Sequence, residues 1–153
     1  MKGHNPRTKE PSITSVLKKI SDDKALVLFN SIAVSSETDR YVPIKEMNLS
    51  TKQYYSRISG LTDAGLVKRL KGKYFLTLLG KVVYDSQMII GKTLSYYWKL
   101  KVIESIEVSA SGLPNEERSQ LIDALIDNHQ IKDIFMKSIS IPSNMQTQTA
   151  LAG

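Results

Sequence analysis

Two neighbouring groups of side chains near the middle of the chain have the chemistry to bind nucleic acid. The first offers hydroxyls, an amide, a phenol and two cations, and comprises Ser50, Thr51, Lys52, Gln53, Tyr55, Ser56 and Arg57. Groups of these types bond to base edges and phosphates. The second is a cluster of cations, Lys68, Arg69, Lys71 and Lys73. Together they predict a nucleic-acid-binding surface; the alternative is an ordinary solvated helix and hairpin.

A short helix over residues 50–64 is expected to carry the first group. Ser50 is a good N-cap because its hydroxyl accepts from an amide of the first turn. Tyr54, Ile58 and Leu61 recur at helical spacing and predict a buried stripe. The polar side chains between them would then face away from the core. Gly65 would end the helix, because glycine adopts a positive φ without strain.

A basic β-hairpin is predicted directly after this helix. Residues 66–70 and 73–77 are rich in apolar and β-branched or aromatic side chains. Lys71-Gly72 lies between them and supplies the glycine that a tight hairpin turn needs. The cation cluster therefore lies at the tip and ends of the hairpin.

Residues 49–80 resemble the winged helix-turn-helix family of transcriptional regulators, in particular the small archaeal and MarR-like proteins. The matching residues are Leu49-Ser50, Ile58, Leu61, Ala64-Gly65-Leu66-Val67, Lys68-Arg69 and Tyr74-Phe75-Leu76-Thr77 followed by Gly80. The resemblance extends over about residues 21–107. It implies a mainly α fold with a small β-hairpin wing, in which the helix before the hairpin reads DNA.

The segments before the helix fit this resemblance with one departure. A short helix over residues 12–20 and a stronger one over 22–35 are expected, the second burying Leu26, Val27, Leu28, Phe29 and Ala33. Residues 40–42 would form a third strand beside the wing. Asn48 suits a left-handed position in the turn before Ser50. Pro43 stands where the family usually has an apolar helical residue, so a shorter helix is expected there.

One long helix is expected from Leu78 to Glu107. It has two adjacent apolar stripes, whereas a surface helix needs one, so a second stripe indicates a partner. We expect homodimerisation through Val82, Ile89, Tyr96, Tyr97, Trp98, Leu100 and Ile103. The alternative is a helix that folds back on its own domain, with Gly91 as the break. Two shorter helices, one on each side of His129, would follow.

The predicted organisation is a winged helix-turn-helix core, a long dimerisation helix and short C-terminal helices. Residues 1–11 would form a flexible basic arm, 12–80 the winged-helix domain, 81–141 the helical dimerisation region and 142–153 a disordered tail. Residues 1–103 hold 18 Lys and Arg against 8 Asp and Glu, and the remainder 3 against 7. A basic front and an acidic back suit a protein whose front meets a polyanion.

Composition and motifs argue against several other classes. The chain has no cysteine, so disulfides and thiolate metal sites are excluded and a reducing, cytoplasmic setting is expected. No apolar run reaches the ~20 residues of a membrane helix, and no signal peptide is evident. The two histidines, His4 and His129, do not build a catalytic triad or a zinc site, and no phosphate-binding loop occurs. No enzyme activity, metal or cofactor is expected.

The function predicted from these features is sequence-specific recognition of double-stranded DNA by a homodimeric regulator. Gln53 would pair with adenine and Lys52 with guanine or a phosphate, while the wing holds the backbone or the minor groove. The rival is a winged helix used as a protein-binding module, with Tyr96, Tyr97 and Trp98 as its docking surface. A small-molecule effector bound by the same aromatic cluster, or single-stranded nucleic acid stacked on Tyr54 and Tyr55, are further alternatives.

Overall fold

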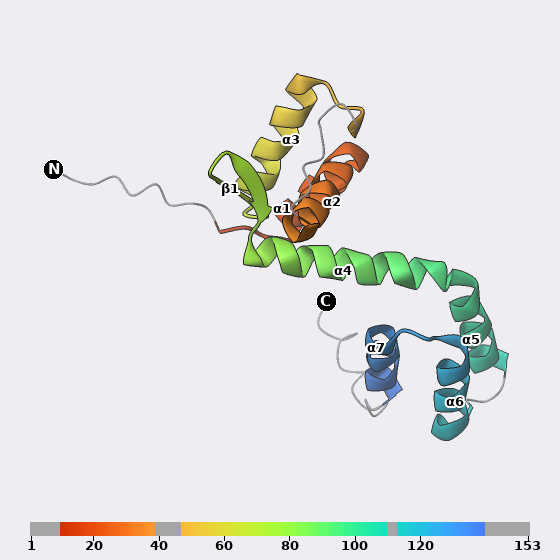
Figure 1. Cartoon of the computed structure of the whole chain (residues 1–153). Coiled ribbons are helices and arrows are strands. Elements are labelled where there is room, and N and C mark those ends of the chain that lie inside the picture. The colour runs from red at the N-terminus through yellow and green to blue at the C-terminus, as the bar shows by residue number, and fades with distance from the viewer. Residues whose placement is uncertain (1–9, 39–46, 110–112, 140–153) are drawn as a thin grey trace, which may run out of the picture. The chain divides into compact units, whose positions relative to one another are not determined.

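The computed structural model describes residues 10–38, 47–109 and 113–139. These residues form seven helices and one two-stranded antiparallel hairpin (Figure 1). The prediction of a mainly α chain with a small β-hairpin is therefore confirmed. The chain divides into two compact units, and the boundary falls between Ser86 and Gln87, six residues beyond the domain boundary predicted from the sequence.

The first unit holds three helices, the hairpin and the first part of a fourth helix. Its elements are α1 (Ile13–Ile20), α2 (Asp23–Thr38), α3 (Thr51–Asp63), β1 (Val67–Leu70), β2 (Lys73–Leu76) and the start of α4 (Leu78–Ser95). The second unit holds the rest of α4, α5 (Tyr97–Ser109), α6 (Asn115–Leu125) and α7 (His129–Ile139). Helices α1, α2 and α3 lie close to their predicted bounds.

The core of the first unit is formed mainly by α2, α3 and the hairpin. The buried side chains are those of Val16, Leu28, Phe29, Ile32, Ala33, Ile58, Leu61, Ala64, Leu66, Val67 and Leu76. Tyr54 packs partly buried against them, so the predicted stripe of α3 is confirmed. The prediction for Val27 was wrong: its side chain is 49% exposed. Position 27 lies on the outer side of α2, because Leu28 and Ile32 define the buried side one turn apart.

Local capping fixes where the first two helices begin. At α1, the hydroxyl of Ser12 accepts from the amide of Ser15 at 3.1 Å, and the hydroxyl of Ser15 accepts from the amide of Ser12 at 3.0 Å. At α2, a carboxylate oxygen of Asp22 accepts from the amide of Ala25 at 3.0 Å. Asp22 and Asp23 also place negative charge at the positive end of the helix dipole.

The chain passes from the hairpin into α4 through a tight polar junction. Gly65 has φ 74°, as the predicted helix stop required. The hydroxyl of Thr77 donates to the carbonyl of Gly65 at 2.6 Å and accepts from the amide of Gly80 at 2.9 Å. Gly80 lies directly against the backbone of Leu66, and a Cβ added there would overlap the Leu66 carbonyl oxygen. The backbone at the start of the hairpin and the backbone at the start of α4 are therefore in direct contact.

The prediction of one helix from Leu78 to Glu107 was wrong. Helix α4 ends at Ser95, Tyr96 forms a turn, and α5 begins at Tyr97. The amide of Tyr96 donates to the carbonyl of Thr93, three residues back, a bond that tightens a final helical turn. Gly91 lies inside α4 and is not the break. The turn instead places the ring of Tyr96 in a core of the second unit, where it is 4% exposed.

That second core explains why the helix stops at Tyr96. Its buried members are Tyr96, Ile103, Ile122, Ile126 and Ile131. The ammonium groups of Lys92 and Lys99 lie 5.1 and 5.2 Å from the centroid of the Tyr96 ring, within cation–π range. Lys99 also donates to the carbonyl of Leu125 at 2.8 Å, at the C-terminal end of α6. The turn at Tyr96 therefore goes together with burial of its ring and with the bond to the Leu125 carbonyl, two tertiary interactions that a helical sequence pattern does not indicate.

Some predicted elements lie outside the described residues. These are most of the basic arm with His4, the third strand at 40–42, the helix around Pro43 and the tail 142–153. Met47, Asn48 and Leu49, the three residues before Ser50, are described. Asn48 has φ 54°, which confirms the predicted left-handed position before α3.

Candidate nucleic-acid interface

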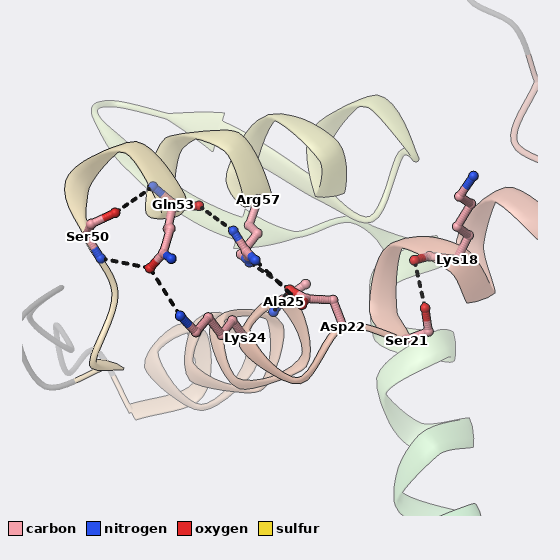
Figure 2. Close-up of polar contacts among 8 residues, drawn as sticks. All are labelled: Lys18, Ser21, Asp22, Lys24, Ala25, Ser50, Gln53 and Arg57. Atoms are coloured by element: carbon pink, nitrogen blue, oxygen red, sulfur yellow. Dashed lines mark hydrogen bonds and ion pairs between the residues drawn. The ribbon is translucent and has the colours of Figure 1, made fainter.

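The start of α3 is fixed by a reciprocal pair of hydrogen bonds between Ser50 and Gln53 (Figure 2). The hydroxyl of Ser50 accepts from the amide of Gln53 at 3.2 Å. The side-chain oxygen of Gln53 accepts from the amide of Ser50 at 3.1 Å. This arrangement is a capping box, which satisfies two amides that a helix start leaves without helical partners.

Gln53 therefore has a structural role that the sequence interpretation missed. Its side-chain oxygen also accepts from the ammonium of Lys24 at 3.3 Å (Figure 2). A glutamine that reads adenine uses both its oxygen and its nitrogen. Because the oxygen is already engaged twice, Gln53 is held as a positioning residue for α3. The sequence signal was present in the Ser-x-x-Gln spacing, which is typical of a capping box.

Replacing Gln53 with alanine should lower the free energy of unfolding by about 1 kcal/mol, the usual net worth of one hydrogen bond. Gln53→Glu should stay close to the wild-type protein, because a carboxylate oxygen fills the same acceptor position and favours the helix start. Urea denaturation without DNA measures both. Equal stability of all three proteins would show that the capping bond contributes nothing.

Arg57 is also held within the first unit. Its Nε lies 2.7 Å from one carboxylate oxygen of Asp22, and its Nη2 is 3.5 Å from the other. The Arg57 side chain bonded to Asp22 lowers the pKa of that carboxyl below its ordinary value, and the amide of Ala25 adds to the effect. The Asp22 carboxylate therefore stays charged at pH values somewhat below its ordinary pKa. The ion pair with Arg57 is lost only when the pH falls through the lowered pKa. Arg57 thus ties α3 to the start of α2.

The outward side of α3 carries the remaining predicted contact residues. Thr51, Lys52, Tyr55 and Ser56 are exposed, whereas Ile58 and Leu61 of the same helix are buried. Ser59, Thr62 and the carboxylate residue Asp63 are also exposed, toward the C-terminal end of the helix. These three were not included in the sequence prediction. We call Thr51, Lys52, Tyr55, Ser56, Ser59 and Thr62 the α3 outer face.

The hairpin displays its cations as the sequence predicted. Lys68, Arg69, Lys71 and Lys73 are all exposed. Residues pair Val67 with Leu76, Lys68 with Phe75, Arg69 with Tyr74 and Leu70 with Lys73. Lys71 and Gly72 both have positive φ, at 48° and 80°, so the turn is of the type that matches strand twist. The guanidinium of Arg69 lies 5.7 Å from the Tyr74 ring centroid.

The predicted dimerisation residues separate into two groups. Tyr96 and Ile103 are buried in the second core, and Ile89 and Leu100 pack against it. These four side chains therefore serve the chain's own core. Val82, Tyr97 and Trp98 are exposed, and Trp98 is 78% exposed.

Three exposed apolar side chains of the second unit, Ile90, Leu94 and Val102, were not in the dimerisation prediction and join Trp98, which was. Ile90 and Leu94 lie one turn apart on α4, and Trp98 and Val102 lie one turn apart on α5. All four are at least 49% exposed. We call them the apolar strip. Ile90, Leu94 and Trp98 belong to the second of the two apolar stripes in the sequence, and Val102 belongs to neither. An apolar set of this size on a surface commonly marks an interaction site.

The described residues offer little for other kinds of site. Within residues 10–38, 47–109 and 113–139, no group of three or more His, Cys, Asp or Glu side chains is placed to hold a metal ion. No helix in these ranges has the length and apolar content to cross a membrane. A pocket of about 200 Å³ is lined by Ala33, Ser36, Leu76, Lys81, Tyr84 and Asp85. Ligand sites are usually larger, at roughly 300–1,000 Å³.

Comparison with protein-family models, with curated proteins and with solved structures finds no match to this chain.

Proposed function

We propose that the chain is a cytoplasmic, homodimeric regulator that binds specific double-stranded DNA. One observation carries the proposal: the α3 outer face and the cationic hairpin belong to one compact unit. A helix of this kind fits the major groove of B-DNA, while a basic hairpin suits the phosphates or the minor groove beside it. The exposed polar side chains of both regions lie outside the hydrophobic core of the unit.

The proposed base-reading residues are those of the α3 outer face. Lys52 is suited to guanine or a phosphate. The hydroxyls of Thr51 and Ser56 can donate to or accept from base edges, and can donate to phosphate oxygens. Tyr55 is 57% exposed and adds a phenol with an apolar ring. Gln53 and Arg57 contribute by fixing the start and the orientation of α3.

The proposed dimer contact is the apolar strip. A second copy that covered Ile90, Leu94, Trp98 and Val102 would remove four large apolar side chains from water. Burying such a side chain fully is worth about 1.5–3 kcal/mol. A two-fold dimer would present two α3 helices to half-sites about one helical turn apart.

Selection of bound duplexes from random DNA tests this function. The expected outcome is a pseudo-palindromic consensus with half-sites roughly 10 base pairs apart. Enrichment of one half-site alone would contradict the dimer but keep DNA recognition. No enrichment, together with duplex affinity that does not change with salt, would contradict the whole proposal.

A second candidate is a protein-binding module in a transcription or chromatin complex. The high exposure of Trp98 favours it, because tryptophan is enriched at the energetic centres of protein interfaces. Salt-sensitive duplex binding separates the two functions, since release of counterions is the signature of phosphate contact.

A further inference from the structure

One edge of α3 is bordered by Asp22 and Lys24 at the start of α2 (Figure 2), and by Lys19 of α1. Gln53, Arg57 and Gly60 lie along this edge at spacings of four and three residues. Each meets a different neighbour: Lys24 at Gln53, Asp22 at Arg57 and Lys19 at Gly60. The edge adjoins the α3 outer face at Ser56, because positions 56 and 60 are one turn apart.

Gly60 makes room for Lys19. A Cβ at this position would lie 3.3 Å from both Cδ and Nζ of Lys19. Glycine inside a helix costs about 1 kcal/mol relative to alanine. Here the absence of a side chain lets the end of the Lys19 side chain, from Cδ to Nζ, lie against α3, while Lys19 as a whole stays exposed. A cation from α1 is thereby brought up to the helix proposed to read DNA.

Two lysines lie along this edge. Lys19 and Lys24 are both exposed. The carboxylates nearest to this edge along the chain are those of Asp22, Asp23 and Asp63, and Asp22 is paired with Arg57. The ammonium of Lys24 contacts the neutral amide of Gln53. The edge therefore presents two lysine side chains next to the α3 outer face.

We propose that Lys19 and Lys24 form a second phosphate-contacting row, which holds the DNA backbone along the α1–α2 edge of α3. The row is separate from the hairpin, since it comes from elements that precede α3 in the chain. It rests on the proposed function, because its partner is the same duplex. Contacts of this kind fix register and orientation and do not read sequence.

The first test is the double variant Lys19→Gln with Lys24→Gln. Glutamine keeps most of each side chain's length but removes the charge. The slope of log Kd against log salt should fall by about 2, since each lost phosphate contact removes about 0.9. The selected consensus should stay the same. The matched control is Lys101→Gln with Lys137→Gln, two exposed lysines of the second unit, which should leave the slope unchanged.

The second test locates the row directly. Because the chain has no cysteine, Lys19→Cys gives a single thiol for a tethered DNA-cleaving reagent. Cuts are expected in the backbone flanking each half-site, and Lys137→Cys should give none. A normal salt slope for the double variant, or absence of flanking cuts, overturns this proposal. If the wing variants described below still reduce the slope, the proposed function stands without the row. If the wild-type protein shows no salt-dependent duplex binding, the proposed function itself fails.

Discussion

Neutralising two lysines of the hairpin is expected to weaken duplex binding roughly thirtyfold at 0.15 M salt. The variant combines Lys68→Gln with Lys71→Asn. Loss of two phosphate contacts should lower the slope of log Kd against log salt by about 2, at about 0.9 for each contact. Carried from about 1 M salt down to 0.15 M salt, this change of slope corresponds to a roughly thirtyfold loss of affinity. Fluorescence anisotropy with a labelled duplex over a salt series gives both quantities. Asparagine is chosen at position 71 because φ is 48° there, and asparagine tolerates this conformation.

The control for this experiment is again Lys101→Gln with Lys137→Gln, which removes the same charge from the second unit. A loss of affinity in both double variants would indicate a general effect of net charge. If the hairpin variant had the same slope of log Kd against log salt as the wild-type protein, the hairpin would not be part of the DNA interface. All DNA sequences should weaken alike, because phosphate contacts carry no base information.

Replacing Gly80 with alanine is expected to destabilise the first unit by about 3 kcal/mol, the upper end of the usual cost of overpacking. The added methyl group would overlap the Leu66 carbonyl oxygen, and backbone atoms cannot move aside as a flexible side chain can. In thermal unfolding followed by circular dichroism, the midpoint of this unit should fall by more than about 10 °C.

Gly91→Ala provides a matched control within the same helix. No atom lies within 4 Å of a Cβ at Gly91, so only helix propensity changes. This variant should therefore be more stable than the wild-type protein, by up to about 1 kcal/mol. If Gly80→Ala were as stable as Gly91→Ala, the close contact between the backbone of Leu66 and α4 would be disproved.

Elements whose structure is decided by a few adjacent residues were predicted well from the sequence. The start of α3 at Ser50, its stop at Gly65 and the turn at Lys71-Gly72 depend on caps and on positive φ angles. Such signals are local, and they act in the same way in any fold. The exposure of the hairpin cations followed from them.

Features decided by tertiary packing were predicted less well. Nothing near Tyr96 marks a helix end, since neither glycine nor proline occurs between Lys92 and Ile103. The break depends on Ile122, Ile126 and Ile131, which are distant in sequence and bury the ring. The same limit applies to Arg57, whose partner Asp22 lies 35 residues away. Periodicity predicts which side chains share a face of a helix, but not which neighbour covers that face.

The division of labour around α3 has a consequence for redesign. Residues that hold this helix in place lie on its inner side and along one edge, at Gln53, Arg57 and Gly60. The α3 outer face has no part in the core of the unit. A combinatorial library at Thr51, Lys52, Tyr55, Ser56 and Ser59 would therefore vary the exposed chemistry of α3 while leaving its buried contacts intact, and selection from that library would show which of these side chains determine the proposed DNA preference.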